Sequence, residues 1–427
     1  MWKIGQFGWL LAALLAASLW FYVQRVLVPF QQADAATHGR PRGMLSDLYP
    51  RWLGSRELLL HHRDPYADDV TREIQAGYYG RPLDVARAGD PRDEERFAYP
   101  VYVAFLLAPT VSLPFPAVRD AFRWLLGMVT VASILLWLRV LRWRPSPNGF
   151  AILLLLTLGS YCTVQGIKLQ QLSLLVCGVI AASAVFLVSG QLFLAGVFLA
   201  VATIKPQLVV LVTAWLMLWT LSRWRERQGF FWGFTLSCSF LAAGGEYILP
   251  GWIARFAHAV TAYLDYTDAG SPLEALTTHP IGKLLGILLV LGIAVICWRL
   301  RQSPADSRDF SLVVALVLTT TLAVAPMLAP YNQLLLLPAV FLIAQSWKQL
   351  WRKSGGSRAA CSAAAVFVLW PWMVSLGLML GSLFLAPATI ERAWALPLWS
   401  SPAIPIAILG PLAFLFSDSR AFRARPS

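Results

Sequence analysis

Long apolar stretches alternate with short polar connections along most of the chain. The stretches lie near residues 7–28, 98–113, 119–140, 150–165, 170–189, 191–204, 207–221, 230–249, 281–298, 311–327, 332–346, 360–385 and 398–416. A helix needs about 20 consecutive apolar residues to cross a membrane, and several stretches approach or exceed that length. The pattern therefore predicts an all-α polytopic membrane protein that forms one integral membrane domain over residues 1–427.

Basic residues gather in five groups between or after the apolar stretches, and these groups orient the predicted bundle. They lie within residues 139–144, 223–227, 299–308, 348–358 and 420–425. The positive-inside rule places such groups on the cytoplasmic side. Prolines punctuate residues 98–113, so we treat this stretch as a re-entrant segment or short span rather than a full crossing. A bundle of about 12 transmembrane helices, with both termini inside, then satisfies the charge rule.

The first connection, residues 29–97, differs from the basic groups because it holds 12 acidic and 10 basic residues. More than half of the chain's 22 acidic residues lie in it, so it does not fit the cytoplasmic side. We expect it to form a large first extracytoplasmic loop with surface helices, including an amphipathic one that begins near Leu48. Residues 251–280 are expected to form a second extracytoplasmic connection.

The composition favours a membrane protein over a soluble one. Hydrophobic residues make up 58% of the chain and charged residues 13%, which is about half the charged fraction of a soluble domain. The cytoplasmic basic groups account for the net charge of +13, so membrane lipids are expected partners and nucleic acid is not. The five cysteines lie far apart without metal or disulfide spacing, and no DxD pair occurs. No metal or other cofactor is therefore expected.

Asp47 is the first candidate for chemistry in the outer loop. It stands just before a predicted helix, where an aspartate commonly caps the helix N-terminus. A carboxylate held at the boundary between water and lipid could instead take a proton from an acceptor hydroxyl. The residues alone leave both interpretations open.

Lys168 and Lys205 stand on the predicted outer side, against the charge rule, and each has a glutamine within three residues, Gln171 and Gln207. An ammonium group in such a place suits a phosphate, and glutamine suits sugar hydroxyls, which need both donors and acceptors. The alternative is that each lysine simply extends to the lipid headgroups. The pairs nevertheless make a phosphate-linked sugar an attractive ligand.

Two further candidates lie between later spans. Tyr331 and Asn332 stand at the outer edge, where the pair either caps the following helix or lines the same cavity. Histidines in connections are usually solvated, and among the five in this chain His279, just before a span, is the one we include in the candidate site.

Several short motifs follow one another in a recognisable order. They are Asp47-Leu48-Tyr49, Asp64-Pro65-Tyr66, Tyr99-Pro100, Lys168-Leu169-Gln170-Gln171-Leu172, Lys205-Pro206-Gln207 and Tyr331-Asn332. Together with the large loop after the first span, this ordered set resembles glycosyltransferase family 87, a polyprenyl-phosphate-mannose-dependent mannosyltransferase-like group of the GT-C superfamily.

The resemblance implies a membrane hexosyltransferase. It would transfer a hexose, with mannose expected, from a polyprenyl-phosphate donor to a hydroxyl of a lipid or glycan acceptor, with inversion and without metal, on the extracytoplasmic face. Asp47 would be the general base, and Lys168 and Lys205 would neutralise the leaving phosphate. The sugar-orienting residues would be Tyr99, Gln171, Gln207, Tyr331 and Asn332. An apolar groove near residues 98–113 would hold the polyprenyl tail.

Two alternatives from other functional classes remain at this stage. A transporter or flippase of lipid-linked sugars would share the many spans, but we see no internal repeat of the kind such carriers often have. An inactive homologue that binds lipid-linked sugars would keep the motifs without the reaction. The chain has no N-x-S/T sequon, which fits a bacterial inner membrane.

Overall fold

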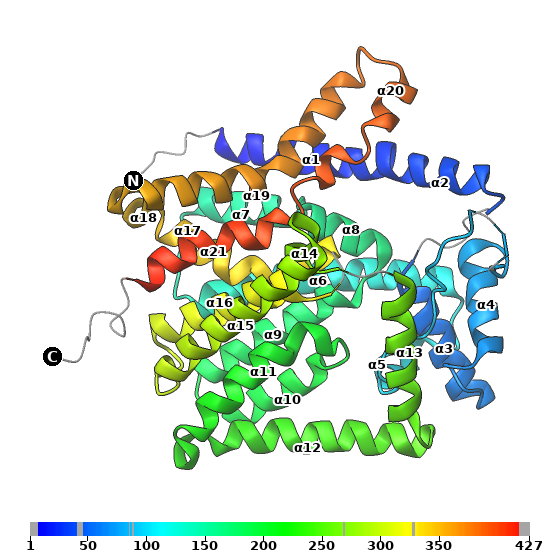
Figure 1. Ribbon diagram of the computed structural model, residues 1–427, viewed down its shortest axis with the longest axis horizontal. Helices are drawn as coiled ribbons and strands as arrows, with labels where there is room; N and C mark the ends of the chain where they lie inside the picture. The colour runs from blue at the N-terminus through cyan, green and yellow to red at the C-terminus, as the bar shows by residue number, and fades with distance from the viewer. Residues whose placement is uncertain are drawn as a thin grey trace.

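The computed structural model of the chain describes residues 7–40, 46–84, 86–87, 89–267, 270–326 and 329–417. Every regular element in this part of the chain is helical (Figure 1). The elements are α1 (Gly8–Tyr22), η1 (Val23–Leu27), α2 (Val28–Thr37), α3 (Leu48–His61), α4 (Asp68–Tyr79), α5 (Val103–Leu107), η2 (Ala108–Thr110), α6 (Phe115–Val140), α7 (Pro147–Leu158), α8 (Tyr161–Leu169), α9 (Leu172–Val188), α10 (Leu192–Ala202), α11 (Pro206–Leu221), α12 (Trp224–Ile248), α13 (Trp252–Thr267), α14 (Pro272–Leu276), α15 (His279–Leu300), α16 (Arg308–Val324), η3 (Pro330–Leu336), α17 (Leu337–Gln345), α18 (Trp347–Lys353), α19 (Gly355–Gly381), α20 (Pro387–Arg392), η4 (Leu396–Leu398) and α21 (Ala403–Phe416). The predicted all-α class is confirmed for these residues, whereas the basic group at 420–425 lies outside them.

Five segments of the described chain are long and apolar enough to cross a membrane. They are Gly8–Thr37, Phe115–Val140, His279–Leu300, Gly355–Gly381 and Pro387–Phe416. The number rises to seven if two bent pairs each count as one span. These are α7 with α8, bent by 50°, and the continuous η3–α17 segment Pro330–Gln345 with α18, bent by 65°. The protein is therefore a polytopic membrane protein, but the count of 12 crossings is not confirmed. Sharp turns cut the middle of the sequence into apolar helices of 10–17 residues, namely α9, α10 and α11.

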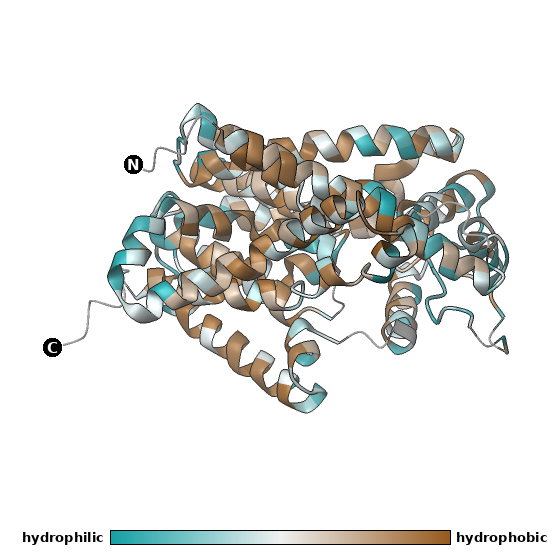
Figure 2. Cartoon of the chain, turned by 90° about the horizontal axis from the view of Figure 1, so that it is seen from above, coloured by the Kyte–Doolittle hydropathy of each residue, from teal (hydrophilic) through white to brown (hydrophobic). Residues whose placement is uncertain are grey.

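The long helices run mostly along the longest axis of the molecule (Figure 1). Apolar residues cover the middle of this axis, and hydrophilic residues gather at its two ends (Figure 2). The first loop with α3, α4 and α13 lies at one end, and the start of α1, the end of α21 and α18 lie at the other. This distribution suits a bundle that stands in a bilayer with one polar end on each side.

The first loop begins later than the sequence suggested, because a π-helical turn joins α1 to α2 and the helix continues to Thr37. The helix predicted near Leu48 exists as α3, but its placement on the membrane surface is wrong. Ten of its 14 residues are buried, since α4, α5 and η2 pack around it. Gly54 allows this packing, because a Cβ there would meet the Phe97 ring at 2.4 Å. The loop is thus a folded layer rather than a helix resting on lipid.

Residues 98–113 and 251–280 also take definite form. The first stretch holds only the five-residue α5 and the turn η2, and at 1.5 Å per residue α5 is about 8 Å long, too short to cross a membrane. The second stretch was expected to be a connection, yet it contains the 16-residue helix α13 and the short α14. α13 runs across the direction of α1 and α12 (Figure 1).

Two glycines bring α10 and α12 into close contact. A Cβ built at Gly196 would lie 2.3 Å from the carbonyl oxygen of Phe230, and one at Gly233 would lie 2.1 Å from that of Phe193. Small residues at helix crossings let backbones approach in this way inside membranes. The crossing anchors α12 to the core of the bundle.

Candidate active site

A cavity of about 670 Å³ lies at the polar end that carries the first loop. Its walls come from the loop, the α8–α9 turn, the α10–α11 turn, α13 and the start of η3. Seven of the nine residues predicted from the sequence line it: Asp47, Tyr99, Gln171, Lys205, Gln207, Tyr331 and Asn332. Side chains separated by up to 285 positions in the sequence therefore share one cavity.

The α8–α9 turn holds the loop against the bundle. Gln170 ends α8 in a left-handed conformation with φ of 49°, and its side-chain Nε2 donates to the carbonyls of Ile167 (2.6 Å) and Lys168 (2.7 Å). The loop binds this turn, because Ser46 Oγ donates to Gln170 Oε1 at 2.7 Å. The backbone N–H of Asp47 also donates to the carbonyl of Leu169 at 2.9 Å. The turn within the Lys168-Leu169-Gln170-Gln171-Leu172 motif is thus the docking point for the loop.

A chain of side-chain hydrogen bonds crosses the floor of the cavity. Gln171 Nε2 donates to a carboxylate oxygen of Asp47. Lys205 Nζ donates to Gln171 Oε1 at 2.7 Å and to Ser173 Oγ at 2.6 Å. Ser173 Oγ in turn donates to Asn332 Oδ1 at 2.6 Å. The carboxylate and the ammonium are therefore tied together through one amide.

Asp47 occupies the N-cap position of α3, as one interpretation of the sequence expected, but its side chain makes no capping hydrogen bond. The carboxylate faces the cavity and accepts from Gln171 instead. Its main-chain carbonyl accepts a hydrogen bond from Arg51 Nη1 at 2.9 Å. The geometry thus leaves the carboxylate available to a ligand in the cavity.

Lys205 is buried, with 5% of its surface exposed, and two aromatic rings accompany it. Its Nζ lies 5.6 Å from the ring centroid of Tyr99 and 5.3 Å from that of Tyr331, within the range of cation–π attraction. The Tyr66 hydroxyl donates to the carbonyl of Tyr99 at 2.6 Å. The Asp64-Pro65-Tyr66 motif therefore helps to position a cavity residue.

Four charged lining residues were missed by the sequence analysis: Arg51, Asp93, Glu95 and Arg96. Arg51 lies over the Tyr99 ring at 4.7 Å and its Nη1 is 3.7 Å from Glu95 Oε2. Burial raises the pKa of the Asp93 carboxyl above its ordinary value. The dense Asp93-Glu94-Glu95 run was the available signal, but mixed-charge segments are usually solvated.

Gln165 is a further missed lining residue, on α8. Only 8% of its surface is exposed. Within the described part of the chain, its side-chain Oε1 is buried and has no hydrogen-bond partner. A buried acceptor of this kind costs about 1–3 kcal/mol until a donor reaches it. The position is therefore suited to a hydroxyl of a ligand.

One wall of the cavity is apolar. α13 contributes Ile253, Phe256, Ala257, Val260 and Leu264. Trp252, at the start of the same helix, packs in a buried cluster with Val101 and Ala104 of the 98–113 stretch. The cavity thus combines a charged floor with an apolar side next to the segment predicted to hold a lipid tail.

Two predicted residues lie outside this cavity. Lys168 is half-buried on α8 and is absent from the lining. His279 begins α15 and its exposed ring lies 3.2 Å from Glu274 Oε1. Across the described residues, no three His, Cys, Asp or Glu side chains come together as a metal-binding group.

Comparison with known proteins gives one match. The model of glycosyltransferase family 87 matches residues 97–326, more than half of the chain. The matched range includes Tyr99, Gln171 and Lys205, whereas Asp47 and Asn332 lie beyond its ends. No curated protein and no solved structure matches the chain. The chain belongs to glycosyltransferase family 87 and is a membrane glycosyltransferase.

Proposed function

We propose that the protein transfers a hexose, with mannose as the expected sugar, from a polyprenyl-phosphate donor to a hydroxyl of a lipid or glycan acceptor. The observation that carries the proposal is the hydrogen-bonded series from Asp47 through Gln171 to Lys205 in a cavity with one apolar wall. A base for the acceptor and a cation for a phosphate stand in the same space, beside a surface for a lipid chain.

In the proposed reaction the acceptor oxygen attacks the anomeric carbon of the sugar, and its proton passes to the Asp47 carboxylate. The bond between that carbon and the phosphate oxygen breaks, and polyprenyl phosphate leaves with the electron pair. Attack opposite the leaving group inverts the anomeric configuration. General-base catalysis of this kind is worth about 10²–10⁴-fold in rate.

Lys205 would hold the phosphate. A lysine has three N–H donors, and Gln171 and Ser173 use two of them within the described residues, which leaves one for a phosphate oxygen. Its charge would offset the negative charge that grows as the phosphate leaves. Arg51 and Arg96 line the same cavity and would add to this field. Lys168 does not line the cavity, so Lys205 is the lysine proposed to contact the phosphate.

The sugar would be oriented by polar groups around the floor. Gln165 offers a buried acceptor, and Asn332 and Gln207 offer amides. Tyr99 and Tyr331 present ring faces beside Lys205. The polyprenyl chain would leave along the apolar side of α13, which adjoins residues 98–113. The basic groups within residues 139–144, 223–227, 299–308 and 348–358 lie at the opposite end of the bundle, which supports an extracytoplasmic position for this cavity.

The decisive experiment is a transfer assay with the purified full-length protein, radiolabelled polyprenyl-phosphate mannose and a hydroxyl acceptor. The wild type should transfer the sugar, and NMR of the product should show the inverted anomer. Asp47→Asn should lower kcat by about 10²-fold or more, since it removes the base and keeps the shape. A matched control is Asp120→Asn, which changes an exposed aspartate on α6 that does not line the cavity.

Three results would contradict the proposal. Transfer from nucleotide sugars but not from polyprenyl-phosphate sugars would overturn the donor class. Full turnover by Asp47→Asn would remove Asp47 as the base. Tight binding of the donor without any transfer would instead support the inactive lipid-sugar-binding homologue.

A further inference from the structure

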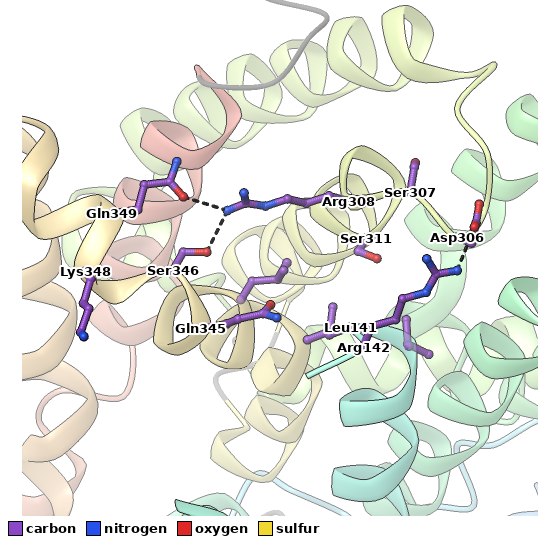
Figure 3. Close-up of a pocket in the computed structure, with 12 residues that line it drawn as sticks. Leu141, Arg142, Asp306, Ser307, Arg308, Ser311, Gln345, Ser346, Lys348 and Gln349 are labelled. Atoms are coloured by element: carbon purple, nitrogen blue, oxygen red, sulfur yellow. Dashed lines mark hydrogen bonds and ion pairs between the residues drawn. The ribbon is translucent and has the colours of Figure 1, made fainter. Parts of the chain in front are cut away.

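A second cavity, of about 530 Å³, lies where α6 ends, α16 begins and α17 meets α18 (Figure 3). Arg142, Arg308 and Lys348 line it, and Asp306 is the one carboxylate among its lining residues. Arg142 Nη2 pairs with Asp306 Oδ2 at 2.8 Å, which leaves the cavity with a net positive charge. An anion would therefore be attracted to it.

The lining of this cavity is polar, with the buried hydroxyls of Ser311 and Ser346 among exposed charged and amide side chains. Arg308 Nη2 donates to Ser346 Oγ at 2.8 Å and to Gln349 Oε1 at 3.3 Å, so the guanidinium is held across the opening (Figure 3). Ser311, with 7% of its surface exposed, adds a hydroxyl from the first turn of α16. Hydroxyls and guanidinium groups are common phosphate donors.

This cavity lies far from the candidate active site. Arg308 opens α16, and Pro326, just beyond the end of the same helix, lines the candidate active site. The helix has 17 residues, about 25 Å at 1.5 Å per residue, which is most of the hydrocarbon thickness of a bilayer. The second cavity is therefore at the basic end of the bundle, in the leaflet opposite the active site.

Aromatic side chains place the cavity at headgroup depth. Trp347 and Trp351 stack on α18 with ring centroids 5.6 Å apart, and α18 bends 65° away from α17. Trp143 packs edge-on against Phe341 at 5.8 Å, one residue after the lining Arg142. Tryptophan is enriched where lipid headgroups meet the hydrocarbon. The occupant that fits is a lipid headgroup rather than a solute of the cytosol.

Arg142 holds an uncommon backbone conformation. It follows the end of α6 with φ of 50°, a left-handed position where glycine is favoured, and the N–H of Trp143 donates to the carbonyl of Leu138 at 3.0 Å. A side chain larger than glycine is strained here. The conformation directs the guanidinium toward Asp306 and the cavity (Figure 3).

We propose that this cavity binds the phosphate of an anionic phospholipid of the basic-side leaflet, with Arg142, Arg308 and Lys348 as the cationic ligands and Ser311 and Ser346 as hydroxyl donors. Binding would join α6 to α16 and to the α17–α18 bend. A lipid that links these elements adds its binding free energy to the stability of the folded bundle.

Native mass spectrometry of the purified full-length protein with phosphatidylglycerol or phosphatidylcholine tests the proposal. Each cation near a membrane surface contributes about 1 kcal/mol, or about fivefold in affinity. The triple variant Arg142→Gly, Arg308→Gln, Lys348→Gln should therefore lose phosphatidylglycerol affinity by about two orders of magnitude. Arg142→Gly alone should lose about fivefold without unfolding the chain, because glycine suits that backbone.

The matched control removes equal charge from the same end of the molecule but outside the cavity, as Arg144→Gln, Arg299→Gln and Arg352→Gln. This control should keep the selective affinity for phosphatidylglycerol. Equal losses in both triples would show a diffuse basic surface and overturn the site. Inorganic phosphate that raised the thermal stability as much as the lipid does would overturn the lipid assignment. Lipid binding is measured without sugar transfer, so the outcome is independent of the proposed reaction.

Discussion

Gln171 is central to the proposed mechanism. Among the described residues, its amide is the one side-chain group that hydrogen-bonds to both the carboxylate of Asp47 and the ammonium of Lys205. Replacing Gln171 with leucine removes the donor to Asp47 and one acceptor of Lys205, while Ser173 still accepts from Lys205. The side-chain volume is nearly kept, so the α8–α9 turn, which is held by Gln170, should persist.

The size of the effect follows from the bond that is lost. A hydrogen bond to a charged acceptor contributes about 1.5–3 kcal/mol, which corresponds to a fall in rate of roughly 10- to 150-fold if the bond positions the base in the transition state. The fall should appear mainly in kcat, since Gln171 is expected to act through Asp47 more than through binding of the donor. Gln333→Leu is the control, because it removes a neutral bond of 2.8 Å to the carbonyl of Ser401 outside the cavity.

A double-mutant cycle in the transfer assay decides the case. In an Asp47→Asn background the base is already absent, so adding Gln171→Leu should cost only about twofold more. The combined loss would then be far smaller than the product of the two single losses. Losses that multiply fully would refute the reasoning, since they would show that Gln171 acts independently of Asp47.

Three other variants test the fold and its pH dependence. Burial raises the pKa of Asp93, so wild-type stability should fall as pH rises through the interval between the ordinary and the raised pKa. Asp93→Asn should abolish that fall, and Tm measured against pH in detergent checks it. Gly233→Ala should cost about 1–3 kcal/mol by forcing α10 from α12, whereas Gly127→Ala, which faces open space, should leave Tm nearly unchanged. Arg227→Met should lower stability by about 3 kcal/mol, because the buried Arg227 guanidinium donates to the main-chain carbonyls of four residues. An unchanged Tm would show that these hydrogen bonds do not stabilise the fold.

The fold class could be predicted because apolar length and basic groups are local properties of the sequence. The number of spans could not, since turns such as the one at Lys205-Pro206 divide apolar stretches into helices whose crossing depends on tertiary packing. α13 was missed for a related reason. It carries charged and polar residues and covers a cavity with one face, so no long apolar run marks it.

Much of the candidate site could be predicted because polar residues between apolar runs are rare and conspicuous. Lys205, Gln171 and Asn332 stood out in this way and do share one cavity. Gln165 did not stand out, because its distinguishing property is a buried oxygen without a partner in the described structure. Arg51 did not stand out either. What distinguishes it is its position over the Tyr99 ring, which its neighbours in sequence do not reveal.

The contact between the first loop and the α8–α9 turn can form only late in biosynthesis. Asp47 is synthesised 124 residues before the glutamine that contacts it, and Asn332, at the end of the same series, comes later still. A nascent chain that has completed only its first loop therefore presents a carboxylate without its partners. The ribosome must deliver about three quarters of the polypeptide before the cavity is complete, and long-range closure of this kind is slow.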